Sequence, residues 1–402
     1  MFAAVGLVAI AGAAWALSNR GGKTPLATRA NTKVATHGEA ARALGAVAPT
    51  SPPPTSTAPT TSTTIAAKPS TTRTLSLART VTGQLSPKSV VASGSGLVFA
   101  QNMIYNHTVS IFGRDGQLVK TIPDSVTLSD FGYPQYPASV KGGPVEAAFS
   151  PDGKDAYVSN YSMYGPGFAH PGDDVCSPAQ HIDSSFVYRI DVAGLAIDKV
   201  IPVGAVPKYV AVTPDGRYLL VSNWCSYNLS VIDTTTETEV KRIPLGPYPR
   251  GIAVDPQSRV AYVAVMGSRD VAMVSLADFT LTWIRNVGNG PRHLVMDPAG
   301  RYLYVTLNAD GRTAKIDLTT DTVVARVATG SAPRSMTIAP DGESLYVVNY
   351  ESATVTKVRA ADMQVLQTVR TDAHPIGITY DAATNRLWVA CYSGAIMLFN
   401  DA

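Results

Sequence analysis

A proline recurs at a fixed interval through the second half of the chain. The prolines separated by 42 residues are Pro207, Pro249, Pro291, Pro333 and Pro375. Each one opens an apolar run, a turn rich in Pro, Asp or Gly, and a second run that ends near Tyr-Val. Pro87 and Pro144 open similar but longer units, of 57 and 63 residues. A fixed period of this length is typical of repeat folds, so the sequence predicts seven units, two of which carry insertions.

Each unit has the pattern of four short strands. In the unit that begins at Pro249, β-rich runs fall at 251–254, 260–265, 270–276 and 280–287. Four strands in 42 residues are typical of a propeller blade, whereas a sandwich would need no fixed period. The last unit has only three such runs, and residues 77–85 can supply the fourth. The expected fold is all-β: a seven-bladed β-propeller with four-stranded antiparallel blades, closed by an N-terminal strand that joins the C-terminal blade.

The segment before the propeller has a different composition. Residues 1–18 are almost wholly apolar and predict a signal peptide or a membrane anchor, although no Lys or Arg precedes them, which suggests that the natural start lies upstream. Residues 19–74 form a Pro/Thr/Ser-rich linker, expected to be disordered, and residues 75–402 form the propeller. We therefore expect an extracytoplasmic protein, secreted or anchored, that meets the membrane only through its N-terminal segment.

The charge distribution argues against nucleic acid as a partner. Residues 1–80 hold eight Lys or Arg residues and one acidic residue, Glu39, so their net charge is +7. The net charge of the whole chain is +3. The remaining residues therefore carry −4, and no basic domain is left to bind nucleic acid.

The ends of the second strands carry a recognisable motif. The sequences AYVSN (156–160), LYVVN (345–349) and LYVTL (303–307) resemble the signature of YVTN-type β-propeller repeat proteins. That group includes archaeal surface-layer proteins and lactonase-like seven-bladed propellers. The resemblance covers about residues 77–402 and implies a binding platform, a structural surface protein or an enzyme.

One face of the propeller collects the features that could form a site. The links between blades and the links after the Tyr-Val strands emerge together, so the insertions at 124–143 and 162–185 cover the same face. The residue after each unit-opening proline is basic in five of seven units. These residues are Lys88, Lys208, Arg250, Arg292 and Arg334, with Val145 and Ile376 in the other two units. A ring of cations would bind anions; alternatively, each could pair with an acidic neighbour in its own blade.

Aromatic and histidine residues are expected on the same face. The residues after the second strands include Tyr161, Trp224, Tyr350 and Tyr392, which could stack on a ligand or, as we favour, pack between blades. His293 and His374 are weak candidates for catalytic groups. The histidines at 107, 170, 181, 293 and 374 are expected in linkers or insertions. No cofactor is predicted; the alternative is a divalent metal bound by His170, Asp173, Asp174 and His181.

The three cysteines differ in their positions. Cys176 and Cys225 fall on the same face in adjacent blades, so an exported protein would join them in a disulfide, whereas Cys391 is expected to be a packed free thiol. The sequence lacks a CxxCH haem motif, a GxSxG elbow and a phosphate-binding loop. We therefore expect a monomeric protein that binds an anionic small molecule, a glycan or an envelope protein. The alternatives are a lactonase-like hydrolase on the same face and a purely structural envelope component.

Overall fold

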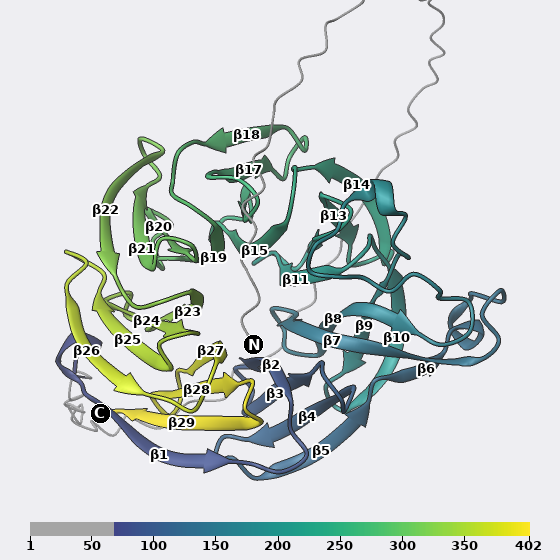
Figure 1. The fold of residues 1–402 in the computed structure, drawn as a ribbon, viewed down its shortest axis with the longest axis horizontal. Coiled ribbons are helices and arrows are strands. Elements are labelled where there is room, and N and C mark those ends of the chain that lie inside the picture. Colours follow the sequence, from purple (N-terminus) through teal and green to yellow (C-terminus); the bar gives the residue numbers. More distant parts are fainter. Residues whose placement is uncertain (1–67) are drawn as a thin grey trace, which may run out of the picture. The chain divides into compact units, whose positions relative to one another are not determined.

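Residues 68–402 form a ring of seven β-sheets in the computed structural model, which describes this part of the chain (Figure 1). The ring is a seven-bladed β-propeller whose blades each have four antiparallel strands. The innermost strands of successive blades contact one another around a central channel. The predicted N-terminal segment at 1–18 and the linker up to residue 67 lie outside the described residues.

The strands of each blade follow one another from the channel outward, except in the last blade. The first three blades are β2 (Pro87–Ala92), β3 (Leu97–Asn102), β4 (Thr108–Gly113) and β5 (Leu118–Pro123); β7 (Ser139–Phe149), β8 (Asp155–Tyr164), β9 (Phe186–Asp191) and β10 (Ala196–Pro202); and β11 (Pro207–Val212), β12 (Tyr218–Asn223), β13 (Asn228–Asp233) and β14 (Thr238–Pro244). The next three are β15 (Pro249–Val254), β16 (Val260–Val265), β17 (Val271–Ser275) and β18 (Leu281–Ile284); β19 (Pro291–Met296), β20 (Tyr302–Leu307), β21 (Arg312–Asp317) and β22 (Thr322–Ala328); and β23 (Pro333–Ile338), β24 (Ser344–Asn349), β25 (Thr354–Arg359) and β26 (Val365–Arg370).

The seventh blade combines both ends of the propeller sequence. It contains β27 (Pro375–Asp381), β28 (Arg386–Cys391) and β29 (Ala395–Asp401), with β1 (Leu75–Val81) as its outermost strand. Strand β1 pairs antiparallel with β29, from Leu75 opposite Asp401 to Val81 opposite Ile396. The C-terminal strands therefore have a paired outer edge, which an open blade would lack.

Proline and glycine fix the two ends of the inner strands. The recurring prolines are the first residues of β11, β15, β19, β23 and β27, where a missing N–H costs no ladder hydrogen bond. At the other end, the Pro-Asp-Gly turns need a left-handed glycine: Gly153, Gly216 and Gly342 have φ of 72°, 74° and 73°. The repeat thus sets where each inner strand starts and turns back.

Apolar side chains fill the space between neighbouring sheets. Between the third and fourth blades, for example, Leu220 and Val231 belong to the same buried cluster as Ile252 and Val263. Similar clusters of buried residues lie around the ring. Stability therefore comes from repeated sheet-to-sheet packing rather than from one central core.

The two predicted insertions fold against each other. The first contains β6 (Ser125–Thr127), which pairs with an extended β7, and the short helix η2 (Leu128–Phe131). The second contains the helix η3 (Pro178–Gln180). Tyr136 of the first insertion stacks on Phe168 of the second, with ring centroids 4.8 Å apart. The insertions therefore add a fifth strand to the second blade and a shared aromatic contact. No helix within residues 68–402 is long and apolar enough to cross a membrane.

Residues 68–74 lie at the end of the propeller opposite the insertions. The helix η1 (Ser70–Thr72) rests on the turn between β23 and β24, where the Ser70 N–H donates to the Asp341 carboxylate over 2.7 Å. Strand β23 starts at Pro333 on the insertion-bearing face and ends near this turn. The chain therefore enters the propeller from the opposite face.

Candidate functional site

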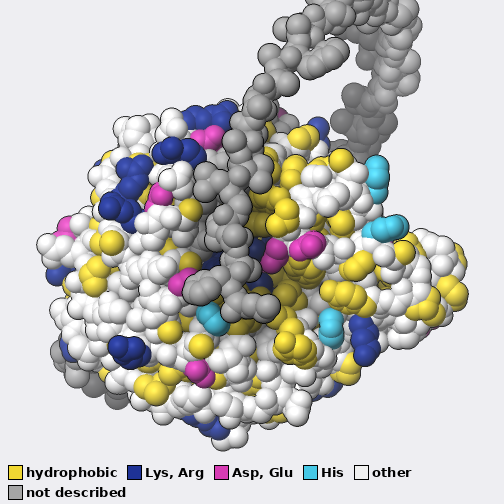
Figure 2. Space-filling view, viewed as in Figure 1, with side chains coloured by type: hydrophobic (Ala, Val, Ile, Leu, Met, Phe, Trp, Pro, Cys, Tyr) yellow, Lys and Arg dark blue, Asp and Glu magenta, His cyan; other side chains and the backbone are white. Residues whose placement is uncertain are grey.

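The channel opens into a cavity of about 310 Å³ on the insertion-bearing face. Figure 2 shows hydrophobic side chains, with Lys or Arg side chains between them, around the middle of this face. The cavity is lined by Lys88, Met103, Tyr161, Asp174, Lys208, Trp224, Arg250, Met266, Arg292, Arg334, Tyr350 and Tyr392. All nine residues predicted to bind a ligand are in this wall. The wall draws on all seven blades, because each blade delivers at least one side chain from one of two repeat positions.

A repeated hydrogen bond places the residue that follows the second strand in the third to seventh blades. Its N–H donates to the carbonyl of the residue before the proline of the same blade. This bond runs from Trp224 to Val206 and from Met266 to Tyr248 over 2.9 Å each, and from Tyr392 to His374 over 3.0 Å. The accepting residues have left-handed backbones, with φ of 55°, 63° and 56°. This link brings the aromatic or Met side chain and the basic side chain of one blade to the same rim.

The five basic side chains lie among the aromatic rings rather than among carboxylates. Lys88, Lys208 and Arg292 are buried, and Arg250 and Arg334 are half-buried. The Lys208 Nζ atom lies 4.3 Å from the Tyr161 ring centroid and 5.0 Å from that of Trp224. Arg334 lies 4.1 Å above the Tyr350 ring. Cation–π contacts hold these heads in place without neutralising their charge.

Within residues 68–402, only Lys208 of these five cations forms an ion pair. Its partner is Asp174, 2.7 Å away, which belongs to the insertion of the preceding blade. Pairing with acidic neighbours in the same blade, the alternative considered from the sequence, is therefore not found. The cavity keeps an excess of positive charge.

Burial and mutual repulsion lower the pKa values of these cations. Burial, with Arg250 beside it, lowers the pKa of Lys208 to about 7, although the Asp174 carboxylate opposes this. Burial and the nearby Arg334 lower the pKa of Arg250 to about 10. Burial and the nearby Arg250 also lower the pKa values of Lys88 and Arg292. Bringing like charges together in a partly dry cavity costs free energy, which a bound anion would recover.

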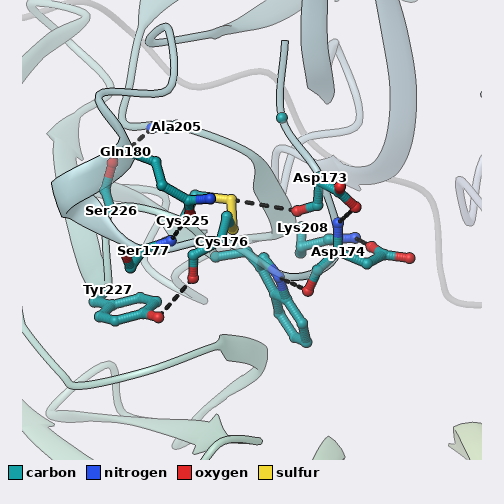
Figure 3. Close-up of a disulfide and its surroundings, with 12 residues drawn as sticks. Asp173, Asp174, Cys176, Ser177, Gln180, Ala205, Lys208, Cys225, Ser226 and Tyr227 are labelled. Atoms are coloured by element: carbon teal, nitrogen blue, oxygen red, sulfur yellow. Dashed lines mark hydrogen bonds and ion pairs between the residues drawn. A yellow bond between two sulfur atoms is a disulfide. The ribbon is translucent and has the colours of Figure 1, made fainter. Parts of the chain in front are cut away.

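A disulfide holds the second insertion over the cavity. Cys176 and Cys225 are joined, as the sequence predicted, and link the insertion to the third blade (Figure 3). The Tyr227 hydroxyl donates to the Cys176 carbonyl over 2.6 Å, and the Trp224 indole donates to the Asp174 carbonyl over 3.1 Å. The backbone beside Asp174 is thus fixed on two sides. Cys391 is a buried free thiol, and burial raises its pKa to about 12.

A second polar layer lies one residue farther along the inner strands. It contains Glu146, Tyr209 and His293. The Tyr209 hydroxyl and His293 Nε2 are 3.1 Å apart, and His293 Nδ1 is buried without a hydrogen-bond partner among the described residues. Burial and the nearby Arg250 and Arg292 lower the pKa of His293 to about 3, so its imidazole is neutral at pH 7. Burial raises the pKa of Glu146 to about 7 despite the neighbouring Lys88.

Several expectations for the histidines need correction. His293 lies within strand β19 and does not line the cavity, whereas we had expected it in a linker. His374 is exposed and stacks on Tyr350 at 4.5 Å, so it is a rim residue. The proposed metal ligands do not gather: no cluster of three or more potential ligands occurs within residues 68–402. The reason is that Asp174 is paired with Lys208, and His170 lies beside Asp183.

Residues that sequence reasoning did not assign to the ligand site also shape it. Asp174 lines the cavity although we had considered it only as a metal ligand, and Met103 and Met266 complete the wall. Glu146 and Tyr209 share a repeat position with His293, so the same 42-residue period could have revealed this layer. Val145 and Ile376, which interrupt the basic ring, are buried outside the cavity wall.

Comparison with known families gives one partial match. Residues 292–388 resemble the Cytochrome D1 heme domain family. This segment runs from the start of β19 to the middle of β28, so it covers the fifth and sixth blades and part of the seventh. No curated protein matches the chain. The partial match agrees with the propeller fold and raises the question of whether the cavity suits haem.

The cavity wall offers only some of the side chains that can hold a haem iron. Protein-bound haem takes an axial ligand from His, Cys, Met or Tyr. In residues 68–402 the wall has no His or Cys but does contain two Met and three Tyr residues, and the Met266 sulfur accepts a hydrogen bond from Arg292 over 3.7 Å. The only buried imidazole near the channel, that of His293, is bonded to Tyr209. The Lys and Arg residues could pair with carboxylates, but their crowded positive charge disfavours a metal cation.

Proposed function

We propose that the protein binds an anionic small molecule in the central cavity. The observation that supports this most is the set of four cations, Lys88, Arg250, Arg292 and Arg334, without a carboxylate partner among the described residues. Buried charges are normally paired, so an unpaired group of this size is costly unless a ligand completes it. Propellers commonly serve as rigid platforms for such sites. We also propose that the chain is a YVTN-type propeller, which the Tyr-Val motifs at 156–160, 303–307 and 345–349 support.

The size and the lining of the cavity favour a small ligand with an apolar body and several negative groups. Its volume of about 310 Å³ lies near the lower end of the range for small-molecule sites. Four aromatic and two Met side chains provide surfaces for an apolar body, while the cations come from five different blades. A compact aromatic polycarboxylate has this combination of features.

Trimesate, the benzene-1,3,5-tricarboxylate ion, is a suitable probe for calorimetric titration of the full-length protein. We expect the variant Arg250→Glu, Arg292→Glu, Arg334→Glu to lose at least about a hundredfold in affinity, since each charged hydrogen bond contributes about 1.5–3 kcal/mol. Because buried Arg292 could be needed for folding, the single variant Arg334→Gln serves as a second test and should lose about tenfold.

The matched control reverses three exposed charges elsewhere. Lys241, Arg312 and Arg370 are exposed and outside the cavity wall, so changing them to Glu alters the net charge equally. We expect this control to bind trimesate like the unmodified protein in 150 mM salt, because exposed charges are screened. Equal losses in both triple variants, or none in either, would contradict a cavity site. Cyclohexane-1,3,5-tricarboxylate, which lacks the flat ring, should bind more weakly than trimesate.

An extracytoplasmic setting is part of the proposal. The Cys176–Cys225 disulfide supports it, because disulfides persist in oxidising compartments. The chain enters the propeller opposite the cavity, through Ser70 and Asp341. Blocking of cysteines before and after reduction, in protein taken from its native compartment, would test the disulfide.

The other two functions have less support. A lactonase-like hydrolase that used His293 or His374 has less support, because His293 lies outside the wall with its pKa lowered to about 3, and His374 is an exposed rim residue. A purely structural component would not need unpaired buried cations. The proposed site includes no cofactor or metal, and elemental analysis of the purified protein tests that statement.

A further inference from the structure

Asp174 is the one acidic residue among the twelve that line the cavity. Its Oδ1 atom lies 2.7 Å from the Lys208 Nζ atom. The two partners differ in environment: the Lys208 side chain is 5% exposed and the Asp174 side chain is 77% exposed. A buried ammonium is therefore reached by a carboxylate that remains largely in water. Moving this carboxylate away from Lys208 into water would change its hydration little, because most of its surface is already hydrated.

The surroundings of Lys208 form a complete binding subsite for a carboxylate. The Tyr161 hydroxyl donates to the same Asp174 Oδ1 atom over 3.3 Å. The Tyr161 and Trp224 rings flank the ammonium and exclude other acceptors from its sides. Two donors thus converge on one oxygen position. A carboxylate delivered by a ligand would find the same two donors that Asp174 uses.

The insertion keeps Asp174 close to this position without binding its side chain elsewhere. Its backbone carbonyl accepts from the Trp224 indole, and the disulfide at Cys176 is two residues away (Figure 3). The contacts of the Asp174 side chain within residues 68–402 are those with Lys208 and Tyr161. The loop therefore acts as a short tether that holds the carboxylate at a high local concentration.

We propose that Asp174 is a tethered competitor that occupies the Lys208–Tyr161 subsite until a ligand carboxylate displaces it. This inference rests on the proposed function and adds two details to it. The ligand carries a carboxylate for this subsite, and its affinity is set by competition with Asp174. The remaining anionic groups of the ligand pair with Lys88, Arg250, Arg292 and Arg334 in the rest of the cavity wall.

The test compares Asp174→Asn with Asp173→Asn. Asp173 is the adjacent residue, exposed and outside the cavity wall, so the two variants remove the same charge from neighbouring positions. In calorimetric titrations with trimesate at pH 7, we expect Asp174→Asn to bind about tenfold more tightly than the unmodified protein, because a negative charge close to the bound carboxylate is removed. Asp173→Asn should change the affinity by less than about twofold.

A double-mutant cycle with Lys208→Met identifies the subsite. If Asp174 competes for Lys208, the gain from Asp174→Asn should largely disappear when Lys208 is absent. Thermal unfolding and thiol titration establish that each variant is folded with its disulfide intact. Unchanged or weaker trimesate binding by Asp174→Asn would overturn the role of Asp174 as a competitor. The proposed function would still stand if the arginine variants lose affinity. If the arginine variants also keep their affinity, or if no protein binds trimesate, both the competitor role of Asp174 and the proposed function are overturned.

Discussion

The Lys357 Nζ atom lies 2.6 Å from Asp401 Oδ1, and neither side chain is exposed to solvent. Lys357 is on β25 of the sixth blade, and Asp401 ends β29 of the seventh. Asp401 also accepts from the Tyr346 hydroxyl over 2.7 Å, and Lys357 donates to the Arg73 carbonyl over 2.9 Å. One buried ion pair thus joins two blades and the segment that leads into β1.

We expect Lys357→Met to lower the free energy of unfolding by up to about 3–5 kcal/mol, because it removes the nearer counter-charge of the buried Asp401 carboxylate and leaves only Arg73, 3.9 Å away. The double variant Lys357→Met, Asp401→Asn should be more stable than the single one, since Asn is neutral and can still accept from Tyr346. Urea unfolding followed by tryptophan fluorescence measures both. The exposed Lys241→Met is the control, with a change below about 0.5 kcal/mol. A double variant less stable than Lys357→Met would contradict the role of the charge.

Trimesate affinity should fall as the pH rises from 6 to 8.5. The pKa of Lys208 is lowered to about 7, so its ammonium loses its charge over this range. The pKa of Glu146 is raised to about 7, so it gains a negative charge over the same range, near Lys88 and Arg250. Both changes weaken anion binding, and we expect about a tenfold loss. Lys208→Arg keeps its charge and should flatten the profile.

Buffer-dependent calorimetry checks the same prediction independently. If Lys208 and Glu146 are partly deprotonated at pH 8, an anion that restores their protonated forms must take up protons on binding. The observed binding enthalpy should then differ between HEPES and Tris buffers at pH 8, and it should differ little between MES and bis-Tris buffers at pH 6. If the affinity of both Lys208→Arg and Glu146→Gln fell with pH as steeply as that of the unmodified protein, these assignments would be wrong.

Acid should destabilise the protein partly through His293. Its pKa is lowered to about 3, and the ordinary value is about 6.5. Below pH 6.5 the unfolded chain therefore binds a proton at this residue that the folded chain does not, and stability falls as the pH falls. Between pH 7 and pH 4 this corresponds to about 3 kcal/mol.

His293→Gln should remove this part of the acid sensitivity, because Gln does not titrate and can still bond to Tyr209. Urea unfolding at pH 7 and pH 4 gives the difference for each protein, and the unmodified protein should lose about 3 kcal/mol more than the variant. His374→Gln is the control, since His374 is exposed at the rim. If both variants lose stability with pH as the unmodified protein does, His293 does not titrate as we expect.

The fold and the face of the site could be predicted because both follow from the repeat. The 42-residue period fixed the start of the inner strand in the third to seventh blades, and every basic residue after a proline that we assigned to the ligand site lies in the cavity wall. The disulfide was predictable because Cys176 and Cys225 fall in adjacent blades on one face. A periodic sequence determines the same local hydrogen bonds in each unit, such as those of Trp224, Met266 and Tyr392.

The insertions could not be predicted in the same way. Their structure depends on contacts between segments that do not repeat, such as the stacking of Tyr136 on Phe168 and the reach of Asp174 to Lys208. The place of His293 was also missed, because the pairing of β19 with β20 is irregular between Pro291 and Leu294. A bulge of this kind changes which side chains face the channel. It recurs after the prolines of other blades, so only a comparison of the units with one another could have revealed the place of His293.

The inner strands approach one another most closely at two glycines. A Cβ atom on Gly251 would lie 2.8 Å from the Arg292 carbonyl oxygen and 2.8 Å from the His293 Cα atom, which are backbone atoms of β19. A Cβ atom on Gly377 would likewise lie 2.7 Å from the Ser89 Cα atom of β2. Backbone atoms cannot rotate aside as a flexible side chain can, so a methyl group here must push two strands apart.

We therefore expect Gly251→Ala to lower the free energy of unfolding by about 1–3 kcal/mol, the usual cost of overpacking. It should also weaken trimesate binding, because it displaces Arg250 and Arg292 at the cavity. Gly143→Ala is the matched control: its Cβ would meet its nearest neighbours at 3.6–3.7 Å, an ordinary contact distance. Urea unfolding and calorimetry on both variants give the comparison. Equal stability and equal affinity in the two alanine variants would show that the ring has room to expand and that the spacing of the cations is not set by strand contact.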